Sequence, residues 1–105
     1  DFVTVRKTVE SLGVGDIAIS LAGHDKNKPC VVVKVVADDY VMIADGVRRL
    51  ISSPKLKKVK HLQKKENSVE LTDLIGMGQA DDKKIAEALE KYKSNKNGGK
   101  SNAEG

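Results

Sequence analysis

Apolar and polar residues alternate along the first half of the chain in a pattern that predicts β-strands. Ile17, Ile19 and Leu21 alternate with smaller or polar residues, the pattern stops at Gly23, and it resumes in the valine-rich residues 31–36. Period-two alternation of β-branched residues, interrupted by Gly, Asn and Asp, is typical of strands joined by tight turns. Two further strands are expected over residues 40–44 and 47–51, joined by a type I′ hairpin turn at the Asp-Gly pair 45–46.

These strands follow one another too closely for crossover helices. Neighbouring strands should therefore pair antiparallel and curl into a small barrel. Ile17, Ile19 and Leu21 share one face of the first strand and are expected in the core. Residues 31–36 are apolar on both faces apart from Lys34, so we expect the N-terminal arm or the C-terminal segment to cover one face.

The C-terminal third has the pattern of helices. Ser68 is expected to cap a short helix that ends at residues 76–78 and carries Leu71, Leu74 and Ile75. Asp81 or Asp82 should cap a second helix over residues 82–93. Its apolar stripe consists of Ile85, Leu89 and Tyr92, and Glu87 is placed to pair with Lys91. Such a stripe more often packs against its own domain than against a partner.

The chain of 105 residues divides into four predicted parts. Residues 1–12 form an N-terminal arm, 13–66 the barrel, 67–94 the helical extension, and 95–105 a tail rich in Gly and Asn that is expected to be disordered. The arm is interpreted first as a segment that packs Phe2 on the barrel. The alternative is an arm that reaches a polyanion through Arg6 and Lys7.

Charge is distributed unevenly over these parts. Residues 1–65 contain thirteen Lys and Arg against seven Asp and Glu, whereas residues 66–105 contain six against eight. Residues 55–65, KLKKVKHLQKK, contain six lysines and one histidine without an acid. This stretch is either a solubilising face or a polyanion-binding surface, and its density of like charge favours the second interpretation.

The run from Gly15 to Lys34, with its loop Gly23-His24-Asp25-Lys26-Asn27-Lys28, resembles the KOW motif of RNA-binding proteins. The continuation VVADDYVMIADG and the basic segment ending in KHLQ at residues 60–63 resemble bacterial relatives of the ribosomal L-fourteen-e type. Asn27 stands where that family usually has glycine, and Asn tolerates a positive φ. The resemblance implies a mainly β fold, a small SH3-like antiparallel barrel of the KOW class, closed by a fifth strand over residues 59–62 after an irregular basic loop.

The resemblance also implies that the protein binds structured RNA, most plausibly large-subunit ribosomal RNA, as a ribosomal or ribosome-associated protein of the cytoplasm. Loop residues 22–29 are suited to phosphate oxygens, which fix register without reading sequence. A second patch is expected on the basic residues further along the chain. The candidate RNA-binding residues are Gly23, His24, Lys26, Asn27, Lys28, Arg48, Arg49, Lys55, Lys57, Lys58, Lys60, His61, Lys64 and Lys65.

Other functions lack the residues that they need. No Walker loop, dinucleotide fingerprint or His/Cys/Asp cluster occurs, so we expect no enzyme, cofactor, metal or small-molecule substrate. Cys30, the only cysteine, is expected to pack as a small residue, and no apolar run reaches membrane-spanning length. Only three residues are aromatic, which argues against base stacking on aromatic platforms.

A second hypothesis remains open. The chain could be a protein-binding adaptor of the transcription-elongation type or a ribosome-associated regulator. In that case the 82–93 stripe, and not the lysines, would make the contact. The same helix could also dock on a ribosomal protein neighbour.

Overall fold

The computed structural model describes residues 12–24 and 26–104, with side chains described as far as residue 95. Within this part the elements follow one another as five strands, one 3-10 helix and two α-helices. They are β1 (Asp16–Ser20), β2 (Pro29–Ala37), β3 (Tyr40–Ala44), β4 (Lys55–Lys58), η1 (Val59–His61), β5 (Leu62–Asn67), α2 (Val69–Gly76) and α3 (Asp82–Glu104).

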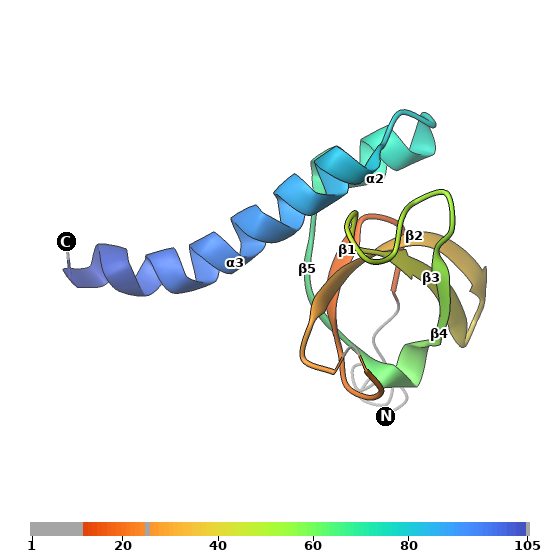
Figure 1. The fold of residues 1–105 in the computed structure, drawn as a ribbon, viewed down its shortest axis with the longest axis horizontal. Coiled ribbons are helices and arrows are strands. Elements are labelled where there is room, and N and C mark those ends of the chain that lie inside the picture. Colours follow the sequence, from red (N-terminus) through yellow and green to blue (C-terminus); the bar gives the residue numbers. More distant parts are fainter. Residues whose placement is uncertain (1–11, 25, 105) are drawn as a thin grey trace, which may run out of the picture.

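The strands form one antiparallel sheet in the order β4-β3-β2-β1-β5. The sheet curls into a small SH3-like barrel whose two edge strands, β4 and β5, are joined through η1 (Figure 1). Register shifts in β1–β5 and β2–β3 pairing mark bulges, which bend a strand and increase its twist. The mainly β fold with a C-terminal helical extension is confirmed.

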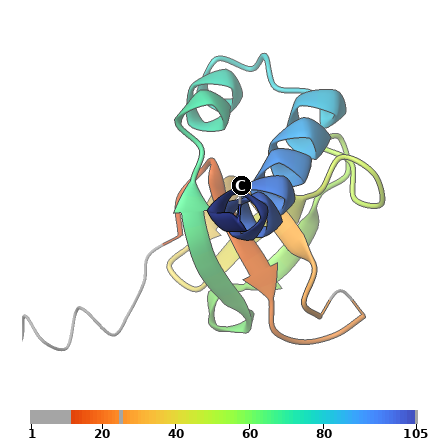
Figure 2. The same ribbon diagram turned by 90° about the vertical axis from the view of Figure 1, so that its left-hand side faces the viewer.

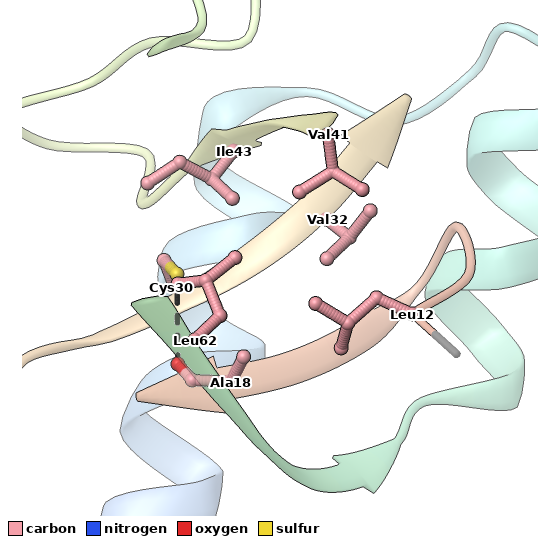
Figure 3. Packing of buried hydrophobic residues seen from close by; sticks show 7 residues of the cluster. All are labelled: Leu12, Ala18, Cys30, Val32, Val41, Ile43 and Leu62. Atoms are coloured by element: carbon pink, nitrogen blue, oxygen red, sulfur yellow. Dashed lines mark hydrogen bonds between the residues drawn. The ribbon is translucent and has the colours of Figure 1, made fainter. Parts of the chain in front are cut away.

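The barrel interior is filled by small and medium apolar side chains. Figure 3 shows this inner core, in which the thiol of Cys30 donates a hydrogen bond to the carbonyl oxygen of Ala18 at 3.5 Å. Leu12, the last residue of the expected arm, belongs to the barrel and not to an appendage. The rest of that arm, with Phe2, Arg6 and Lys7, lies outside the described residues. The inner core consists of Leu12, Ala18, Cys30, Val32, Val41, Ile43 and Leu62.

A second apolar core lies on the outer face of the sheet. Both helices lie on the same side of the barrel (Figures 1 and 2), and α3 extends past it (Figure 1). Of the two segments expected to cover one face of residues 31–36, the C-terminal segment covers Val31 and part of Val33, whereas Val35 and Val36 are exposed. Ile17 and Ile19 face the helices, whereas Leu21 is 45% exposed, so its expected place in the core is wrong. The outer core consists of Ile17, Val31, Ala44, Leu71, Ile85, Leu89 and Tyr92.

Both helices begin at the residues that capping rules predict. Leu71 N donates to Ser68 Oγ at 3.2 Å, and Lys84 N donates to Asp81 Oδ1 at 2.9 Å. Asp82, the other candidate cap, instead accepts from the backbone of the 45–54 loop. The expected Glu87–Lys91 ion pair is not formed; α3 carries a Lys93–Glu90 pair at 3.3 Å.

The helix α3 is longer than predicted. It was expected to end near residue 93 and to be followed by a disordered tail, but it continues to Glu104. The first three turns of α3 are held by packing and form the helix nucleus. Extending an existing helix by one residue costs much less free energy than forming the first turn. Asn and Gly lower helix propensity in the added part, which is why composition predicted otherwise.

The strand expected over residues 47–51 is wrong. Residues 45–54 form a loop, and the fourth strand lies at residues 55–58, where an irregular basic loop was expected. The Asp45 side chain accepts hydrogen bonds from three successive backbone N–H groups, and a loop forms in place of the expected hairpin turn. The fifth strand begins at Leu62 and not at Val59, because η1 occupies residues 59–61. It pairs with β1 and not with β4, so it does not close the sheet as expected.

The start of β1 and helix α2 approach each other at Gly15. Its φ is +91°, and a Cβ there would lie 2.8 Å from both Cα and N of Thr72. Thr72 Oγ1 lies 2.9 Å from the carbonyl oxygen of Val14, and Ser68 N donates to the carbonyl oxygen of Gly15 at 2.9 Å. Only glycine fits this junction, which holds the helical extension on the barrel.

Replacement of Gly15 by alanine should therefore lower the free energy of unfolding by about 2–5 kcal/mol, through backbone strain and overpacking against Thr72. Gly76→Ala is the control, because a Cβ at Gly76 has nothing within 4 Å and alanine favours the helix. Urea unfolding followed by circular dichroism measures both variants. Equal stability of the two variants would contradict the assigned junction.

Candidate nucleic-acid interface

The described residues of the β1–β2 loop, 21–24 and 26–28, are held by backbone hydrogen bonds. Gly23 and Asn27 have φ values of +84° and +70°, which confirms the unusual angles expected of them. Lys26 N donates to the carbonyl oxygen of Gly23 at 3.1 Å, and Asn27 N donates to that of Ser20 at 2.7 Å. The loop therefore holds its own turn, and the side chains of His24, Lys26, Asn27 and Lys28 are exposed.

Lys57 does not belong to the exposed surface. It pairs with Val41, which lies in the inner core, and its side chain is only 9% exposed. Its ammonium group donates to the carbonyl oxygen of Ala22 at 3.3 Å. Lys57 was expected to contact phosphate on an exposed patch, but β4 places it on the inner face of the sheet, where its ammonium is engaged by the loop carbonyl; its phosphate contact stays a prediction. Its stem packs in the barrel while its charge holds the β1–β2 loop.

The 3-10 helix η1 adjoins the same loop. Leu21 N donates to the carbonyl oxygen of His61 at 2.8 Å, and Val59 N donates to that of Asp39 at 2.9 Å. These bonds fasten η1 to the β1–β2 loop on one side and to the β2–β3 turn on the other. Lys60 is exposed and His61 half-buried at this end of the barrel.

Arg48 and Arg49 lie on a turn built around the Asp45 carboxylate. Its Oδ1 accepts the backbone N–H groups of residues 47, 48 and 49 at 2.8–2.9 Å. Partial burial raises the pKa of Asp45, but the three N–H donors and the Arg48 charge outweigh it and hold that pKa below 3.8, its ordinary value. Both arginine residues are exposed.

The end of the β1–β2 loop meets this turn. A small cavity of about 10 Å³ is bounded by Lys28 and Arg49, and a larger groove of about 390 Å³ is bounded by Lys28, Arg48 and Lys93. Loop 21–28 thus adjoins η1 near its start and the 45–49 turn at its end. Basic residues from separate parts of the sequence meet along this loop.

The remaining candidates are separated from this region or already engaged. The ammonium of Lys58 lies 5.9 Å from the ring centroid of Tyr40, and Lys55 is half-buried. Lys64 forms an ion pair of 3.7 Å with the buried Asp16 carboxylate. Lys65 borders a separate hollow beside Tyr92 on α3.

Lys93 is a candidate that sequence reasoning missed. It follows the apolar stripe of α3 by one residue and lies at the groove with Lys28 and Arg48. No local sequence signal marks it, because its place depends on how α3 docks. In the described part of the chain no group of three or more His, Cys, Asp and Glu residues could hold a metal ion, and none of the helices is long and apolar enough to cross a membrane.

The Asp45 turn should depend on the ionised carboxylate. Because its pKa is lowered in the folded state, Asp45 contributes stability above its unfolded pKa, and this contribution is lost as the pH falls through the folded pKa. Asp45→Ala removes the acceptor and should cost about 0.5–2 kcal/mol at neutral pH, whereas Asp45→Asn should cost less because its amide oxygen also accepts. Urea unfolding at pH 7 and pH 3 tests this. If the alanine variant loses as much stability on acidification as the wild type, Asp45 does not contribute to the acid dependence.

Lys57 should control the mobility of the β1–β2 loop. Lys57→Met keeps the stem and removes the bond to Ala22, so the amide hydrogen of Asn27 should exchange faster, while global stability changes by only about 1 kcal/mol. Lys60→Met removes an exposed ammonium and serves as the control. Hydrogen exchange followed by NMR distinguishes the two variants, and identical loop exchange would refute the role given to Lys57.

Comparison with known proteins adds no assignment to these observations. No protein-family model matches the chain, and no curated protein matches it significantly. The geometry of the barrel, its loops and α3 therefore carries the functional argument.

Proposed function

We propose that this protein binds structured RNA through phosphate contacts made along the β1–β2 loop and the segments beside it. One observation carries the proposal. Loop 21–28 is hydrogen-bonded to η1 and borders the 45–49 turn, so cations from three parts of the sequence lie along one loop. These cations are Lys26, Lys28, Arg48, Arg49 and Lys60.

The electrostatics of these side chains support the proposal. All five are exposed, and within the described residues the ion pairs are Lys64–Asp16 and Lys93–Glu90, which involve none of them. Lys26, Lys28, Arg49 and Lys60 therefore retain their attraction for phosphate, whereas the charge of Arg48 is partly balanced by the Asp45 carboxylate. Each phosphate neutralised releases counterions, so affinity should fall steeply with salt.

The fixed loop shape favours folded RNA over flexible single strands. Single-strand binding relies on aromatic platforms, and the chain has only three aromatic residues. Tyr92 is buried in the outer core, and Tyr40 is half-buried beneath the Lys58 ammonium. A rigid set of charges can instead match the spacing of phosphates in a pre-formed RNA.

Large-subunit ribosomal RNA is the target that the resemblance to KOW proteins supports. The SH3-like barrel agrees with that resemblance, and the positive φ of Asn27 preserves the turn where the family usually has glycine. We therefore place the protein on the ribosome of the cytoplasm, as a component or an associated factor.

The adaptor hypothesis loses its main support. It required a free apolar stripe on residues 82–93, but Ile85, Leu89 and Tyr92 are 0%, 4% and 8% exposed because they pack against the barrel. The same burial removes this stripe as a docking surface for a ribosomal protein neighbour. A protein partner would have to use another face.

Neutralising the cations along the loop should release the protein from RNA. The triple variant Lys26→Gln, Lys28→Gln and Lys60→Gln should lose about a hundredfold or more in affinity for large-subunit ribosomal RNA at low salt, and its log–log salt slope should be less steep by about 2–3. The matched control neutralises Lys83, Lys84 and Lys91, three exposed lysines of α3. It makes the same change in net charge at a different place.

Filter binding over a range of salt concentrations measures affinity and slope, and sucrose-gradient fractionation shows whether the wild type migrates with large subunits. Equal losses in the two triple variants would mean that total charge, and not the loop, determines binding. Absence of any salt-dependent RNA binding in the wild type would refute the proposed function.

A further inference from the structure

The groove between the barrel and α3 differs from the rest of the basic surface in its shape and lining. Its volume of about 390 Å³ lies in the range of small-ligand sites. Its walls come from the segment 28–29 at the start of β2, the 45–49 turn and α3. Hydrogen bonding of Ile51 N to Asp82 Oδ1, at 2.7 Å, ties the 45–54 loop to the helix and fixes the distance between these walls.

The charges at the groove favour an anionic group. Lys28, Arg48 and Lys93 border it, together with the carboxylates of Asp45 and Glu90. Asp45 is occupied by three backbone N–H groups. Glu90 forms only a surface pair with Lys93, in which the side chains are 75% and 50% exposed, and such pairs hold their partners weakly. Lys93 is therefore able to turn toward a phosphate.

The groove also offers apolar and planar surface. Pro29, Val47, Ala86 and Leu89 line it, and Val47 is 73% exposed at its mouth. The guanidinium plane of Arg48 is of the kind on which unpaired bases stack when no aromatic ring is present. A phosphate, a sugar and a base would each find suitable chemistry within one cavity.

We propose that this groove receives a single unpaired nucleotide of the bound RNA, with its phosphate on Lys28 and Lys93 and its base against Arg48 and Val47. The inference rests on the proposed RNA-binding function and deepens it. Phosphate contacts along the β1–β2 loop position the RNA, and the groove selects RNAs that present a bulged nucleotide. The helix α3 thereby becomes part of the binding site as well as part of the core.

The test uses two fluorescein-labelled RNA hairpins that differ only by one bulged nucleotide. Fluorescence anisotropy of the full chain should show about tenfold tighter binding of the bulged hairpin, since stacking a base on a protein surface is worth roughly that factor or more. Equal affinity for the two hairpins would overturn the groove assignment while leaving the proposed function intact. Failure to bind either hairpin at low salt would refute both.

Matched variants locate the preference on the groove. Lys93→Gln should remove most of the preference for the bulged hairpin, whereas Lys91→Gln, which neutralises an exposed lysine on the same helix outside the groove, should keep it. Glu90→Gln should tighten binding of the bulged hairpin more than Glu87→Gln does, because only Glu90 borders the groove. All four positions are exposed, so circular dichroism should show unchanged folding. Equal effects within either pair would overturn the proposal.

Discussion

The structure depends on a sheet whose central part is buried on both faces. Val31 and Val32 are neighbours on β2, both are 0% exposed, and they belong to different cores. A barrel of about fifty residues encloses too little apolar volume to be very stable alone. The outer core adds side chains such as Ile85, and each fully buried Ile, Leu or Val contributes about 1.5–3 kcal/mol. The helical extension is therefore an integral part of the domain. If α3 detached from the sheet, its apolar stripe and Val31 would both become exposed to water.

This double burial determines where the basic side chains lie. Because α3 is held on the outer face, the groove has a rigid wall, and Lys93 is placed opposite Lys28 and Arg48. On the inner side, Lys57 uses its charge to hold the Ala22 carbonyl and so fixes the loop that carries Lys28. Binding groups on supported elements lose less conformational entropy when they meet a ligand than groups on free loops. The two cores thus preorganise a surface that is otherwise made of long, flexible cations.

Local sequence rules predicted the elements whose structure is decided locally. Alternation located the first three strands. Capping chemistry located the start of one helix at Ser68 and of the other at Asp81 or Asp82, of which the structure uses Asp81. The rules failed where a side-chain hydrogen bond or a tertiary contact determined the structure in place of local propensity. The Asp45 carboxylate bound three backbone N–H groups and replaced the expected hairpin, although the Asp-Gly pair is a strong hairpin signal. Lys57 looked like its neighbours in a basic run, and only the register of β4 against β3 turned it inward. Lys93 could not be assigned to the candidate site from the sequence, because the hydrophobic periodicity of a helix does not specify where that helix packs on the sheet.

The balance of charge at the groove argues for selectivity over simple attraction. The exposed loop cations form no salt bridge in the described part of the chain, although Arg48 interacts electrostatically with the Asp45 carboxylate. In the proposed binding mode they attract any polyanion, and their contribution is the same for every RNA sequence. At the groove, the Glu90 carboxylate repels a phosphate, and Lys93 must break its ion pair with Glu90 to bind one. A bare anion also makes no favourable contact with the apolar residues that line the groove. An occupant must therefore bring apolar surface together with its negative charge. A nucleotide does so and an isolated phosphate does not. The proposed binding mode therefore separates affinity along the loop from discrimination beside the helix.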